Sequence, residues 1–139
     1  MTPDQAKEIL SLHSGRHEDI YHPKSEHGFI GMLRPYRGLI EENFHEVMEA
    51  IRVLAPELNR EMVDTKLMED LWVICYMPQV CVLYEEGTVR RHGLITPEDS
   101  KRLSEWIDQI AYAVMILLEI NDPYEAFQGQ EYKGKSDSS

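Results

Sequence analysis

The sequence predicts an all-α fold: a compact, four-helix bundle-like domain with a long ordered N-terminal loop and a frayed C-terminal tail. Two segments, starting at Thr2 and Thr96, place a capping hydroxyl before a proline and then an acid, which is typical of a helix N-terminus. Apolar residues also recur every three or four positions over long stretches. With 139 residues, 42% of them hydrophobic, the chain has the size and composition of one globular domain. We expect this domain to cover residues 1–128 and a flexible tail to cover 129–139.

The first helix is expected over residues 3–14. Thr2 is the predicted cap, and Gln5 stands three residues later, where its side chain can return a hydrogen bond to the cap. Gly15 suits the position after the last turn, because glycine adopts the left-handed conformation at little cost.

Residues 15–35 are predicted to form a loop, since glycine and proline punctuate them and no helical or strand period persists. Loops of this length are either functional or disordered. Apolar residues are frequent here, so we expect the loop to pack against the helices, with Phe29, Ile30 and Leu33 largely buried.

The second long helix is expected from Pro35 or Tyr36 to Ala55, where Pro56 would end it. Its apolar positions follow spacings of four and three residues and form one stripe along a helix. The stripe consists of Tyr36, Ile40, Phe44, Val47, Ile51 and Leu54.

A third helix is expected to start near Lys66, with Asp64 or Thr65 as its cap. Residues 71–84 are apolar on nearly every side and allow two interpretations. One is a long central helix kinked at Pro78, and the other is two strands, because Trp, Val, Ile and Tyr suit a pleated surface. We favour the kinked helix, since the surrounding segments are helical.

Residues 85–95 are expected to form a polar connector before the last long helix. That helix should begin at Pro97, after the Thr96 cap, and continue to about residue 120. The sequence Asn-Asp-Pro at 121–123 should end it, and a short segment at 124–127 could dock back onto the domain.

Charge and cysteine content limit the function classes. The formal net charge of −11 argues against a nucleic-acid binder, which needs a basic face to neutralise phosphates. Cys75 and Cys81 match no zinc or redox spacing and are expected to be buried, reduced thiols. The N-terminus lacks signal-peptide character, and the longest apolar run has nine residues, too few to span a bilayer. We therefore expect a cytoplasmic protein without a membrane segment.

Four of the six histidines stand close together in the N-terminal part, together with several acids. They are His13, His17, His22 and His27. Imidazole and carboxylate groups are ligands for zinc and other transition metals, so this cluster is a candidate metal site. The alternative is a set of loop histidines with ordinary hydrogen bonds.

Two further motifs are weaker. Glu42 and His45 have the Glu-x-x-His spacing of di-iron proteins, but the motif occurs once, and His45 would point away from the apolar stripe. Arg90, Arg91 and His92 could bind a carboxylate or phosphate, or the arginines could pair with the glutamates just before them. We find no phosphate-binding glycine loop, nucleophile elbow or pair of catalytic carboxylates in the sequence.

Residues 41–70 contain nine acids against three bases, and such a stretch could attract a basic partner. The leading hypothesis is a small, acidic, non-catalytic interaction or regulatory module, for example an immunity-type inhibitor of a basic partner. The alternative hypothesis is a metal-binding protein or metalloenzyme that uses the histidine cluster, with zinc or another transition metal as cofactor.

A homodimer is also expected, because the two most apolar helices carry apolar residues outside their inward stripes. A four-helix domain gives each helix one inward face, so these residues would need cover from a second copy. The predicted interface consists of Trp72, Tyr76, Val80, Met115, Ile116 and Ile120.

Overall fold

The computed structural model describes residues 1–130 and 132. The predicted all-α class is confirmed: within the described residues the chain forms helices and no strand, with one isolated β-bridge between Leu33 and Tyr36. The helices in chain order are α1 (Pro3–Ser14), α2 (Pro23–His27), α3 (Glu41–Val53), α4 (Ala55–Leu58), α5 (Thr65–Pro78), the π-helix η1 (Gln79–Leu83), α6 (Thr88–Arg91), α7 (Pro97–Glu119) and α8 (Pro123–Ala126).

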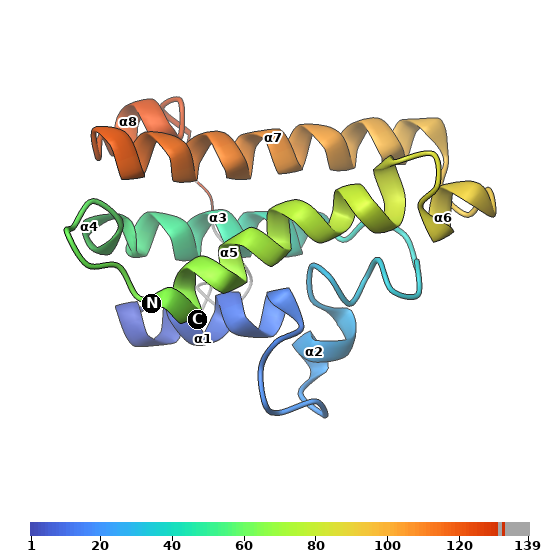
Figure 1. Ribbon diagram of the computed structural model, residues 1–139, viewed down its shortest axis with the longest axis horizontal. Coiled ribbons are helices and arrows are strands. Elements are labelled where there is room, and N and C mark those ends of the chain that lie inside the picture. The colour runs from blue at the N-terminus through green and yellow to red at the C-terminus, as the bar shows by residue number, and fades with distance from the viewer. Residues whose placement is uncertain (131, 133–139) are drawn as a thin grey trace.

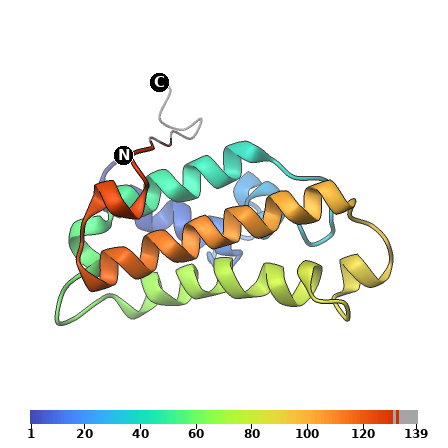
Figure 2. The same cartoon turned by 90° about the horizontal axis from the view of Figure 1, so that it is seen from above.

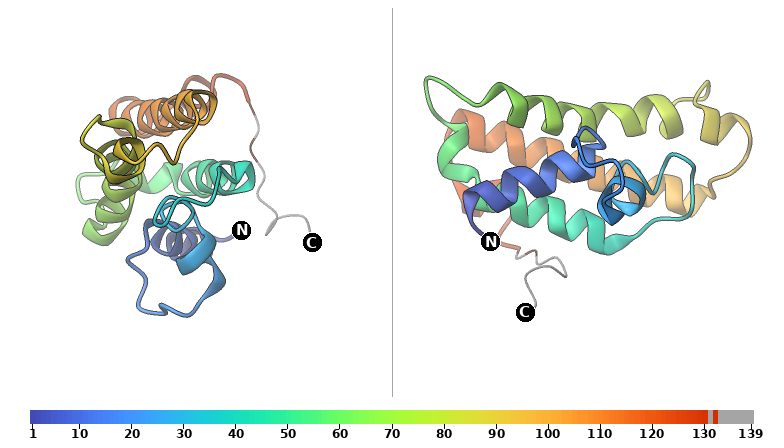
Figure 3. Two further views of the ribbon diagram at one scale, coloured as in Figure 1. Left: turned by 90° about the vertical axis from the view of Figure 1, so that its right-hand side faces the viewer. Right: turned by 90° about the horizontal axis from the view of Figure 1, so that it is seen from below.

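The longer helices surround a shared core. α1 packs against α3 and α5, and α7 packs against α5 and α3, so each of the four contacts two others. Figure 1 shows α7 above α3 and α1 below, with α5 in front, and Figure 3 shows the same arrangement end-on. Of the shorter helices, α4 and α8 lie at one end and α6 at the other, while α2 lies near the end of α1.

The predicted helix starts are present in detail. Thr2 Oγ1 accepts a hydrogen bond from the Gln5 N–H at 3.2 Å, and Gln5 Oε1 accepts one from the Thr2 N–H at 2.8 Å. The two bonds satisfy donors that the first turn of α1 would otherwise leave free. Thr96 caps α7 through one bond, in which its Oγ1 accepts the Asp99 N–H at 3.1 Å.

The segment between α1 and α3 contains the short helix α2, where the sequence predicted a loop throughout. His22 caps α2 by accepting a hydrogen bond from the Lys24 N–H at 3.0 Å. The predicted burial is confirmed for Phe29, Ile30 and Leu33. The segment therefore supplies part of the core.

α3 begins at Glu41, about five residues later than predicted. The stretch before it is held in other ways: the Arg37 N–H bonds to the Met32 carbonyl oxygen at 3.0 Å, and the Tyr36 hydroxyl donates to Asp99 Oδ2 at 2.8 Å. Gly38 has a φ of 97°, which interrupts a helix. The local bond to Met32, the turn at Gly38 and the long-range bond to Asp99 together outweigh the helical spacing of the apolar residues.

Residues 71–83 are helical, and Tyr84 follows in an extended conformation, so the two-strand alternative is wrong. At Pro78 the backbone changes from α- to π-helix, because proline has no N–H to donate and its ring crowds the preceding turn. The Gln79 side chain donates to the Cys75 carbonyl oxygen at 3.0 Å, and the Tyr84 N–H bonds to the Gln79 carbonyl oxygen at 2.8 Å. The wider turn thus keeps its polar groups bonded.

The C-terminal contacts reach beyond the predicted domain boundary at residue 128. Asp122 caps α8, which packs on α7, and Phe127 is buried. Tyr132 is also buried, and its hydroxyl donates to Gln109 Oε1 at 2.8 Å. Most of the tail predicted over 129–139, namely residue 131 and residues 133–139, lies outside the described residues.

Candidate functional site

His13, the first candidate metal ligand, is fully buried, and both of its ring nitrogens are engaged. Nε2 lies 2.6 Å from Glu46 Oε1, and Nδ1 accepts the Phe29 N–H at 2.9 Å. Since Nδ1 is an acceptor, Nε2 carries the proton and donates it to Glu46. No lone pair of this imidazole remains for a metal.

The other three histidines have separate local partners. Nδ1 of His17 accepts the Asp19 N–H at 3.0 Å, and Nδ1 of His22 accepts the Lys24 N–H that caps α2. Nδ1 of His27 lies 3.0 Å from Arg37 Nη1. Within residues 1–130 and 132, no group of three or more His, Cys, Asp or Glu side chains is arranged to hold a metal ion. The structure therefore does not bring the histidine cluster together as a ligand set.

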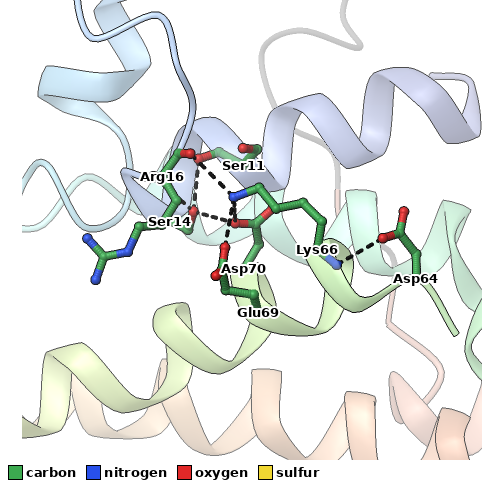
Figure 4. Close-up of polar contacts among 7 residues, drawn as sticks. All are labelled: Ser11, Ser14, Arg16, Asp64, Lys66, Glu69 and Asp70. Atoms are coloured by element: carbon green, nitrogen blue, oxygen red, sulfur yellow. Dashed lines mark hydrogen bonds and ion pairs between the residues drawn. The ribbon is translucent and has the colours of Figure 1, made fainter.

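The end of α1 is joined to α5 by a buried polar contact that the sequence analysis missed (Figure 4). Ser14 and Asp70 are both buried, and the Ser14 hydroxyl lies 2.9 Å from Asp70 Oδ1. Lys66 Nζ lies 3.0 Å from the same oxygen and 3.0 Å from Glu69 Oε1. Burial acts to lower the pKa of Lys66, but its bonds to the two carboxylates outweigh that effect and raise it. Because Ser14 on α1 and Asp70 on α5 are both buried, their contact is a structural joint between the two helices.

The acidic stretch 41–70 is not one solvent-facing surface. Three of its acids are buried, Glu46, Glu49 and Asp70. Glu46 contacts His13, and Arg52 forms an ion pair with Glu49. These carboxylates hold the fold together and cannot attract a partner.

The basic motif at Arg90 lies at the α6 end of the molecule. Among the described residues no ion pair joins Arg90 or Arg91 to the preceding glutamates, and Arg90 Nη1 instead donates to the Leu83 carbonyl oxygen at 2.7 Å. Arg90, together with Lys101 and Glu105, lines a cavity of about 520 Å³. The cavity lining therefore carries both positive and negative charges. The observed role of Arg90 is to hold α6 against η1.

Apolar side chains exposed on α5 and α7 form the clearest functional candidate. Trp72 is 70% exposed, Tyr76 48% and Met115 46%. Met68, Trp72 and Tyr76 follow one another at four-residue intervals on α5, so they share one side of that helix. On α7 the spacing of four and three residues does the same for Ala111, Met115 and Leu118.

The two sets face the same side of the molecule. The opposite side of α5 carries Lys66 and Asp70, which bond to the end of α1, so the Trp72 side lies toward α7 and solvent. On α7 a different side is covered by α8, which packs on this helix and accepts a 2.6 Å hydrogen bond from Tyr112 through Glu125. In Figure 2, α8 and α3 lie on one side of α7 and α5 lies on the other, and no described helix lies over α5 and α7 from this viewing direction. We call this surface the α5–α7 flank and define it by Met68, Trp72, Tyr76, Ala111, Met115 and Leu118.

Three residues of the predicted interface lie elsewhere. Ile116 is half-buried against the core and lies on the side of α7 that faces α8. Ile120 is exposed beyond the end of α7, and Val80 is half-buried within η1. Leu118 is exposed and belongs to the flank. The structure thus brings together Trp72, Tyr76 and Met115 of the six predicted residues.

Three acidic side chains border the flank, and one of them, Glu69, forms an ion pair with Lys66. Glu69 stands beside Trp72 and Tyr76 on the outer side of α5, and Asp108 and Glu119 stand on the outer side of α7. All three are exposed. The flank is therefore an apolar surface with an acidic border.

By length and composition alone, the helical stretch Thr65–Arg91 could cross a membrane; a third of its most apolar window is buried inside the fold. The buried part includes Leu67, Leu71 and Ile74, which pack in the shared core. The same criterion is met by core helices of water-soluble proteins.

Comparison with known proteins adds no relative to this description. A scan against protein-family models, a search of curated proteins and a search of solved structures each found no match. Functional inference for this chain accordingly depends on its own residues, of which the α5–α7 flank is the strongest candidate for a site.

Proposed function

We propose that the protein is a non-catalytic interaction module, built on a four-helix bundle-like scaffold, that binds a basic partner through the α5–α7 flank. The observation that carries the proposal is the exposure of Trp72, whose ring is large, rigid and costly to leave in water. Tryptophan is among the residues most enriched at the energetic centres of interfaces. The second tryptophan, Trp106, is 6% exposed and serves the core.

The acidic border selects the class of partner. A partner with an apolar centre and lysines or arginines around it would place opposite charges at the rim, which speeds encounter and fixes orientation. A second copy of this chain would instead bring two acidic borders together, each with Glu69, Asp108 and Glu119, and like charges repel. The border thus favours a basic partner over the homodimer that the sequence predicts.

The binding test uses a defined probe. A synthetic helical peptide of about 18 residues, roughly 27 Å long, carries leucine on one side and lysine along both borders. We expect it to shift the emission of Trp72 to shorter wavelength and protect that ring from acrylamide. Raising the salt concentration should weaken binding. A matched peptide with glutamate in place of lysine is expected not to bind.

Substitutions locate the binding surface. Trp72→Ala and Met115→Glu should abolish peptide binding, measured by anisotropy of a labelled peptide, whereas Tyr21→Glu, at an exposed position between α1 and α2, should leave it unchanged. Equal binding by the lysine and glutamate peptides, or binding that survives both flank substitutions, would contradict the proposal.

Sedimentation equilibrium tests the competing occupant. At micromolar concentration and low salt we expect the monomer mass of 16.2 kDa. Twice that mass, reduced to the monomer value by Met115→Glu, would show that a second copy occupies the flank. Ile116 is unsuitable for this test because it packs against the core, so a charge there would unfold the protein.

A further inference from the structure

His13 connects three parts of the molecule from a fully buried position near the end of α1. Its Nε2 donates to Glu46 on α3, and its Nδ1 accepts the Phe29 N–H at 2.9 Å. Its own carbonyl oxygen accepts the Ile30 N–H at 2.9 Å. One residue therefore holds the backbone at 29–30 through two hydrogen bonds, one of which uses the ring.

The backbone at Gly28 packs closely against the His13 ring. A Cβ atom at Gly28 would lie 3.1 Å from His13 Nδ1 and 2.3 Å from the Lys24 carbonyl oxygen. Only glycine fits here, so the turn lies directly against the ring.

The arrangement requires a neutral imidazole. A second proton on Nδ1 would place two donors, the ring N–H and the Phe29 N–H, against each other. The charged groups facing the ring are Glu46 from α3 and Lys24 from α2, with Lys24 Nζ 3.3 Å from Glu46 Oε1. Glu42 lies one turn before Glu46 on the same side of α3.

The surroundings of the ring act in opposite directions on its pKa. Burial is the largest influence and lowers the pKa of His13, and Lys24 lowers it further, whereas the bond to Glu46 raises it. Burial prevails, so the folded protein keeps the ring neutral at pH 7.

We propose that His13 is an acid-released latch: protonation of Nδ1 breaks its bond to Phe29 and frees the segment between α1 and α3, while α3, α5 and α7 stay folded. The released segment would uncover an apolar surface, because Phe29, Met32 and Leu33 are buried against the core. Phe29 itself lies against Trp106, with ring centroids 6.4 Å apart.

Hydrogen exchange measured residue by residue by NMR tests the latch. Between pH 7 and pH 5 we expect the protection of the Phe29, Ile30 and Met32 amides, corrected for intrinsic exchange, to fall. If opening takes up one proton, the fall approaches tenfold per pH unit. Amides in the middle of α7, such as Ile110, should keep their protection.

A non-titrating variant separates His13 from other groups. In His13→Asn the amide oxygen can take the place of Nδ1 as acceptor for the Phe29 N–H, so the pH dependence of protection should disappear. The matched control is His92→Asn, at an exposed position after α6, which should behave as the unchanged protein. An equal fall in protection in His13→Asn would overturn the proposal, as would unchanged protection of Phe29 and Ile30 in the natural sequence.

Should His13→Asn fail to fold, the ¹⁵N chemical shifts of the natural His13 ring decide. Protonation of Nδ1 in step with the loss of protection supports the latch. Loss of protection while Nδ1 stays unprotonated overturns it.

Discussion

The hydroxyl of Ser14 lies 2.9 Å from Asp70 Oδ1, and this buried hydrogen bond joins the last residue of α1 to α5. Asp70→Ala should lower the free energy of unfolding by about 1–3 kcal/mol, because it leaves the Ser14 hydroxyl and the Lys66 ammonium without their shared acceptor. Urea unfolding followed by circular dichroism measures the change.

The control for this joint is Glu69→Ala, since Glu69 contacts the same lysine from a largely exposed position. An exposed ion pair contributes little, so we expect a change within about 0.5 kcal/mol. Equal effects of the two substitutions would show that the buried Ser14–Asp70 bond contributes no more to the free energy of unfolding than the exposed Lys66–Glu69 ion pair does.

The segment between α1 and α3 should be as necessary to stability as a helix. Phe29→Ala is expected to cost about 3–5 kcal/mol, because it removes a fully buried ring beside Trp106 and leaves a cavity. Tyr21→Ala, at a side chain that is 90% exposed in the same segment, should change stability by less than about 0.5 kcal/mol. A small effect of Phe29→Ala in chemical denaturation would mean that the segment does not complete the core in solution.

Stability should fall as the pH is lowered from 7.5 to 5.5. The pKa of His13 is below its ordinary value in the folded protein, mainly through burial, so the unfolded chain binds a proton at higher pH than the folded chain does. The contribution of this group is therefore complete above about pH 6.5 and is lost as the pH falls toward the folded pKa. Urea midpoints across this range measure the loss, and His13→Asn should flatten the dependence where His92→Asn does not.

Cys75 should react slowly with alkylating reagents. Burial raises the pKa of its thiol to about 11, so little reactive thiolate exists at pH 8. In a Cys81→Ser background, mass spectrometry after treatment with iodoacetamide should show Cys75 unlabelled in the folded protein and labelled in urea. Rapid labelling of the folded protein would show that this part of α5 opens readily.

Saturating zinc should leave the melting temperature unchanged. A metal that binds only the folded state raises the melting temperature by mass action, but His13 uses both ring nitrogens and the other three N-terminal histidines bond to separate partners. An increase at pH 7 that His17→Ala or His22→Ala removes would revive the histidine cluster as a metal site. The measurement needs protein without a histidine tag.

Local sequence determined most of the helices. The caps at Thr2 and Thr96 and the glycine after α1 act through hydrogen bonds and backbone conformations that span a few residues, so they can be read from the chain directly. The apolar spacing likewise identified the inward residues of α3, such as Phe44 and Ile51. Proline at position 78 marked the place where the helix changes, though not the π-helical form of the change.

Only the tertiary structure decided which polar residues face inward and which apolar residues stay outside. Glu46 and Asp70 look like members of an acidic surface, yet they are buried because His13, Ser14 and Lys66 approach them from distant parts of the chain. Trp72 and Met115 stay exposed because the helices that pack on α5 and α7, among them α1 and α8, contact other sides of these two helices. The spacing of apolar residues indicates which residues share one side of a helix. Which neighbouring helix covers that side depends on long-range packing.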